Sequence, residues 1–142
     1  MSPEFVADTA LQEQVKNIWK FFAGGPPPPP FTEEQLAATF ASIKAQTNKI
    51  KARGGDVVFT RTPSSGSMAF EKIIFPREKF WDRLLKETDC KGFYYTDYPE
   101  TAGLICPEDS HLSPSDAVIY TKALVNILTK ETNFAFQNFQ TK

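Results

Sequence analysis

Two short apolar segments on either side of a helical one constrain the fold of this chain more than any other feature. Asp56–Arg61 is apolar on consecutive residues, which is typical of a strand buried on both faces, and Gly92–Thr96 predicts a second strand. Between them, the helical spacing of apolar residues predicts a helix whose inner face carries Phe80, Trp81, Leu84 and Leu85. Strands that alternate with helices indicate an α/β fold with a parallel sheet flanked by helices.

The N-terminal part is predicted to be a helix followed by a proline-rich connector. Helical spacing extends from Thr9 to Phe22, and Thr9 with Gln12 forms a capping box. The expected inward stripe is Leu11, Val15, Ile18, Trp19 and Phe22. Pro26–Pro30 is a stiff polyproline segment, which either joins helices or binds aromatic-groove domains. Because a helix start follows at once, we expect a connector.

Two more helices complete the predicted order. One runs from Thr32, capped with Gln35, to about Arg53, and the last begins at Ser113-Pro114. The residues expected to face inward in the last helix are Ala117, Val118, Leu124, Val125 and Leu128. We expect one α/β unit over residues 1–142: a helix in 1–25, the connector in 26–31, the α/β part in 32–130 and a polar tail in 131–142.

The predicted sheet is small for the helices around it. It has two strands, or three if Leu104–Ile105 pairs, whereas buried parallel sheets normally have more members. We therefore expect a partial domain. Either the chain is the C-terminal half of a larger α/β unit, or it completes its sheet by association with an N-terminal half or another copy.

Charge and residue counts exclude several function classes. The sequence of 142 residues has 16 Lys+Arg against 17 Asp+Glu, a balance that argues against a nucleic-acid partner. One histidine and two cysteines are too few for the common zinc sites, so we expect no metal and no cofactor. No apolar run predicts a transmembrane segment, no signal peptide is expected, and nothing indicates a compartment. Cys90 and Cys106 could form one disulfide.

The segment before the last helix holds the main candidate for chemistry. It contains His111, the only histidine, with Glu108 three residues earlier and Asp109 two residues earlier. Ligands of open α/β sheets bind beyond the carboxyl ends of the strands, which is where this loop is expected. An acid that holds one ring nitrogen leaves the other to take a proton, as a general base does. The alternative is that His111 only caps the following helix.

From Lys51 to about Leu128, the chain resembles the C-terminal part of the SGNH (GDSL-type) hydrolase superfamily. The matching features are a glycine turn into a hydrophobic strand, a Pro-Ser loop, the helix start Phe-Pro-Arg-Glu-Lys-Phe-Trp and an acid-x-x-His block before Leu-Ser-Pro. The resemblance implies a flavodoxin-like three-layer fold, with His111 as the base and Glu108 as its orienting acid. The family usually has Asp at the acid position, so Asp109 is the alternative acid. The family's Gly-Asp-Ser, Gly and Asn blocks are absent here.

The resemblance implies serine-type hydrolysis or transfer of an acyl group, on a small-molecule or carbohydrate-borne ester. This chain would supply the base and its acid, and alone it is expected to be inactive. The loop that holds Ser64 and Ser65 lacks a nucleophile-elbow pattern. These serines, with Arg61, are therefore expected to line the substrate, and the alternative is a plain solvent-exposed loop. The alternative function is a non-catalytic interaction module that retains the fold, which the proline run and the scarcity of catalytic groups favour.

Overall fold

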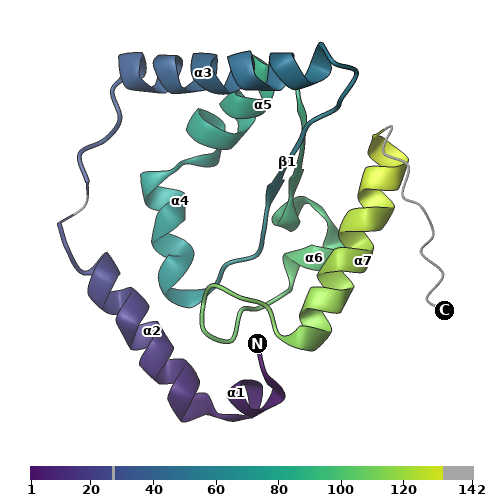
Figure 1. The fold of residues 1–142 in the computed structure, drawn as a ribbon. Coiled ribbons are helices and arrows are strands. Elements are labelled where there is room, and N and C mark those ends of the chain that lie inside the picture. The colour runs from purple at the N-terminus through teal and green to yellow at the C-terminus, as the bar shows by residue number, and fades with distance from the viewer. Residues whose placement is uncertain (27, 133–142) are drawn as a thin grey trace.

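The computed structural model describes residues 1–26 and 28–132. Its elements, in order, are α1 (Pro3–Ala7), α2 (Thr9–Ala23), α3 (Glu33–Lys51), β1 (Val58–Arg61), the 3-10 helix η1 (Gly66–Phe70), α4 (Glu71–Ile74), the π-helical turn η2 (Glu78–Asp82), α5 (Arg83–Thr88), β2 (Lys91–Tyr94), the 3-10 helix η3 (Tyr95–Asp97), α6 (Pro99–Ala102) and α7 (Pro114–Glu131). Figure 1 shows the strands at the centre, α3 along one end and α7 along one side.

The described strands form a two-stranded parallel sheet, which confirms the predicted strand direction. Val58 lies opposite Lys91, and Arg61 lies opposite Tyr94. The segment Leu104–Ile105 does not add a third strand: it is irregular, and Ile105 is 68% exposed.

Helices cover both faces of the sheet, as the alternating pattern predicts. On one face, the side chains of Trp81 and Leu85 pack directly on the backbone of Gly92 in β2. A Cβ at position 92 would lie 2.7 Å from Trp81 and closer still to Leu85, so only glycine fits there. On the other face, Phe93 packs edge-to-face on Tyr120 of α7, with ring centroids 5.7 Å apart. The fold is therefore α/β, with the core formed around Phe93.

The predicted capping signals of α3 and α7 are confirmed. Gln35 N donates to Thr32 Oγ1 over 3.2 Å, and Thr32 N donates to Gln35 Oε1 over 2.9 Å, which is a complete capping box. At the start of α7, Ser113 Oγ accepts from Asp116 N over 3.1 Å. The connector joins α2 to α3, α3 lies against α5 and α2 against η1.

The predicted inward stripe of the N-terminal helix is largely wrong. Helix α2 is capped by Asp8 rather than Thr9, and its one described buried residue is Gln12. The Gln12 amide donates to the carbonyls of Phe5 and Val6, because α1 turns back against this face. The predicted core residue Phe22 is 73% exposed, Leu11 and Ile18 are also exposed, and only Val15 and Trp19 are half-buried.

The helix expected between the two strands forms and ends at Thr88, with a π-helical turn over Glu78–Asp82 before α5. One other expectation needs correction. In α7, Val118 is 53% exposed, and the buried residues are Tyr120 and Ala123. The last helix extends to Glu131, and the rest of the predicted polar tail, residues 133–142, lies outside the described part. Within that part, no helix is long and apolar enough to cross a membrane.

Candidate active site around His111

Two loops lie side by side near the carboxyl end of the sheet. One follows β1 and holds Ser65, and the other joins α6 to α7 and holds Cys106 and Asp109. Ser65 N donates to the Asp109 carbonyl over 2.9 Å, and Cys106 N donates to Ser65 Oγ over 2.9 Å. These bonds hold the histidine-bearing loop at the sheet edge where α/β folds bind ligands.

Within this loop, Glu108 contacts His111 as the three-residue spacing predicts. Glu108 Oε1 lies 2.7 Å from His111 Nδ1. The Glu108 carboxylate is buried, with 4% of its side chain exposed, whereas the His111 side chain is 73% exposed. Because the acid occupies Nδ1, the tautomer with the proton on Nδ1 is favoured, and Nε2 is the ring nitrogen left to accept a proton.

Two further side chains hold Glu108 in place. Trp19 Nε1, from α2, donates to Glu108 Oε2 over 3.1 Å, and Ser110 Oγ donates to both carboxylate oxygens over 2.9 and 3.0 Å. Burial by itself raises the pKa of Glu108, but the hydrogen bonds from Trp19, Ser110 and His111 outweigh burial and lower this pKa. Glu108 therefore stays charged beside the imidazole at neutral pH.

Ser110 contacts His111 at Nδ1, whereas a nucleophilic serine would have to contact Nε2. The Ser110 Oγ lies 2.6 Å from His111 Nδ1, the same atom that contacts Glu108. A ring nitrogen that donates its proton to a carboxylate has no lone pair with which to take the serine proton. Ser110 therefore supports Glu108, and it does not complete a catalytic triad.

The alternative acid, Asp109, is turned toward a different part of the loop cluster. A Cβ on Gly66 would lie 2.1 Å from Asp109 Oδ1, so the Asp109 carboxylate lies directly against Gly66. Asp109 itself has a positive φ of 77°, a backbone conformation that Asp tolerates better than most residues. The contact with His111 thus supports Glu108 as the paired acid.

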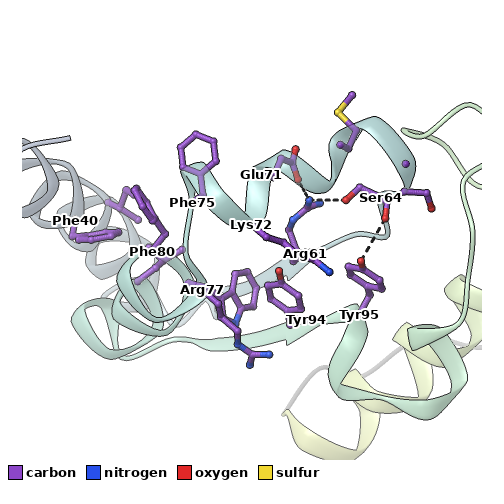
Figure 2. A pocket seen from close by; sticks show the side chains of 16 residues that line it. Phe40, Arg61, Ser64, Glu71, Lys72, Phe75, Arg77, Phe80, Tyr94 and Tyr95 are labelled. Atoms are coloured by element: carbon purple, nitrogen blue, oxygen red, sulfur yellow. Dashed lines mark hydrogen bonds and ion pairs between the residues drawn. The ribbon is translucent and has the colours of Figure 1, made fainter. Parts of the chain in front are cut away.

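The residues expected to line a substrate lie in a separate cavity of about 500 Å³. Ser64, Ser65 and Arg61 line this cavity together with aromatic side chains from the helices and β2 (Figure 2). Arg61 donates to Ser64 Oγ over 3.0 Å and forms an ion pair with Glu71. The Ser64 hydroxyl thus accepts from Arg61, and the Ser65 hydroxyl accepts from Cys106 N. Among the described contacts, neither hydroxyl meets a side chain that could act as a general base.

His111 lines a different, open cavity of about 470 Å³ between α1, α2 and its own loop. No described residue lines both cavities, and the side-chain partners of His111 are Glu108 and Ser110 rather than Ser64, Ser65 or Arg61. Residues 1–26 and 28–132 hold no cluster of three metal-ligating side chains. Cys90 and Cys106 are buried free thiols, so the disulfide left open by the sequence is not formed.

Sequence reasoning missed Trp19 and Ser110. Ser110 stands between the acid and the histidine and could have been considered, since its hydroxyl is within reach of both. Trp19 is 89 residues from Glu108, and no local pattern indicates that they meet. No known protein family, curated protein or solved structure matches this chain.

The lowered pKa of Glu108 predicts acid-dependent stability. A carboxyl whose folded-state pKa lies below its ordinary value of 4.5 stabilises the fold above that pH, and this contribution is lost as the pH falls through the folded pKa. Between about pH 7 and about pH 3, wild type should therefore lose more stability than Glu108→Gln, as measured by urea unfolding. Glu100→Gln, at an exposed residue, is the control and should behave as wild type. Equal pH dependence of wild type and Glu108→Gln would contradict the assignment.

Proposed function

We propose that this chain supplies the general base, His111, and its orienting acid, Glu108, to a serine-type acyl ester hydrolase or acyltransferase of SGNH type. The observation that carries the proposal is the buried carboxylate 2.7 Å from Nδ1 of an otherwise exposed imidazole. A histidine that only capped a helix would not need a buried acid held by Trp19 and Ser110. The substrate would be a small-molecule or carbohydrate-borne acyl ester.

In the proposed reaction, His111 Nε2 takes the proton of a serine hydroxyl as the serine oxygen attacks the ester carbonyl. The imidazolium that forms keeps its Nδ1–H on Glu108, whose negative charge stabilises it. The same proton then passes from Nε2 to the departing alkoxide as the ester C–O bond breaks. Water, or a second alcohol in acyl transfer, repeats the sequence on the acyl-enzyme and releases the serine.

The proposal places the nucleophile and the oxyanion-hole donors outside the described loops. Ser110 is engaged at Nδ1, and Ser64 and Ser65 lie in the other cavity. In the described part of the chain, β1 pairs only with β2, so one edge of β1 can accept another strand. We infer that an N-terminal half or another copy adds strands there, completes a flavodoxin-like sheet and brings a serine to Nε2.

A fluorophosphonate probe tests the proposal, because it labels only a serine that a base activates. We expect no labelling of the 142-residue chain. A chain extended upstream by a segment that carries a Gly-Asp-Ser block should be labelled, and His111→Ala should abolish that labelling. Labelling of the short chain at Ser64 or Ser65 would show that the nucleophile is misplaced. Absence of labelling in both chains would favour the non-catalytic interaction module.

A further inference from the structure

We propose that the cavity between α3, α4, α5 and the sheet binds an organic carboxylate with an aromatic or aliphatic body. This site is independent of His111, and the inference holds whether or not the chain takes part in ester hydrolysis. The cavity, of about 500 Å³, falls within the usual size range of small-molecule sites, about 300 to 1,000 Å³.

The walls of the cavity suit an apolar body. Rings line it from several elements: Phe40 from α3, Phe80 and Trp81 from η2, and Tyr94 and Tyr95 from β2 and η3. Trp81 and Tyr94 meet edge-to-face with centroids 5.2 Å apart, which fixes both rings. Such rings present faces and edges to a bound ring or acyl chain at little cost in side-chain entropy.

Of the charged side chains that line the cavity, only Lys72 has no counterion among the described residues. Arg61 is paired with Glu71, so these two lining residues neutralise each other. Arg77 lies over the Tyr94 ring at 4.6 Å and is paired with Asp82 and Asp97.

Lys72, on α4, is the remaining charged residue of the lining, and within the described residues it forms no ion pair or side-chain hydrogen bond. Figure 2 shows it beside Arg61. An unpaired ammonium next to the guanidinium of Arg61, above an aromatic wall, is suited to a carboxylate whose body enters the cavity. The Ser64 hydroxyl, already on Arg61, lies within the same lining.

Two probes of equal shape, 4-phenylbutyrate and its neutral amide, test the charge preference. The chain has two tryptophans, so in a Trp19→Phe background the emission of Trp81 reports binding. We expect 4-phenylbutyrate to bind about tenfold more tightly than the amide, as a charge-assisted hydrogen bond provides. If the cavity also accepts an aliphatic body, octanoate should bind to it. If the cavity accepts only an aromatic body, 4-phenylbutyrate should bind and octanoate should not.

Variants of Lys72 decide whether the preference arises at this cavity. Lys72→Gln should abolish the preference for the acid, and Lys72→Arg should retain it. Lys122→Gln, an equal loss of charge at an exposed position of α7, should leave both affinities unchanged. The proposal fails if neither probe binds, if acid and amide bind equally, or if Lys72→Gln keeps the preference. His111→Ala, which should not affect this binding, separates this result from the proposed hydrolase.

Discussion

Replacing Glu108 with glutamine is expected to lower the rate of fluorophosphonate labelling of the extended chain by about 10⁴-fold. That is the order of loss in kcat when the acid of a serine triad becomes an amide. The Glu108 carboxylate accepts from Nδ1 over 2.7 Å and so holds the proton there. A glutamine NH₂ in its place would donate to Nδ1, which moves the ring proton to Nε2 and removes the base from the serine. Labelling rates measured with the extended chain would show the effect.

Substitutions around Glu108 provide the matched controls for this measurement. Ser110→Ala and Trp19→Phe each remove a hydrogen bond to Glu108 but leave the carboxylate in place, so their labelling should slow far less than that of Glu108→Gln. Circular dichroism should show that all three variants are folded. If Glu108→Gln were labelled at the wild-type rate, Glu108 would not be the orienting acid, whatever its distance from His111.

Truncation of Phe93 to alanine is expected to destabilise the fold by about 3 to 5 kcal/mol. Phe93 is 1% exposed, stacks on Tyr98 with centroids 4.8 Å apart and packs edge-to-face on Tyr120. Its removal leaves a cavity between β2 and α7 that rigid neighbouring rings cannot close. Since domains of this size have a total stability of about 5 to 15 kcal/mol, the urea midpoint should fall steeply.

Phe75→Ala is the control for the loss of a phenyl ring. Phe75 is 44% exposed, so its truncation should cost much less, about 1 kcal/mol, with a correspondingly smaller fall in the urea midpoint. Comparable losses for the two variants would mean that the core does not centre on Phe93. A molten Phe93→Ala chain, without a cooperative transition, would agree with the prediction.

The features that sequence predicted well are those that depend on neighbouring residues. The capping box of Thr32 and Gln35 and the cap at Ser113 are local hydrogen-bond patterns, and both form as predicted. The Glu108–His111 contact belongs to the same class, because three residues of loop bring the side chains together. The parallel pairing of the strands followed from the helix between them, since a crossover connection dictates direction.

What sequence did not reveal depends on contacts between distant segments. The periodicity of α2 predicted a buried stripe, but periodicity does not say how much protein is present to cover it, and Phe22 and Ile18 remain exposed. The same limit explains Trp19, whose partner Glu108 is far away in sequence. Arg61 and Ser64 were expected to line the substrate at the sheet edge that holds His111, yet their side chains line another cavity.

The bond from Trp19 to Glu108 makes the histidine loop depend on local unfolding of the N-terminal helix. Helix α2 has Gln12 as its one described buried residue, so we expect it to open at lower free energy than the core around Phe93. Each opening removes one of the donors that keep Glu108 charged under burial. We therefore expect hydrogen exchange in α2 and the orientation of the His111 ring to follow the same opening equilibrium.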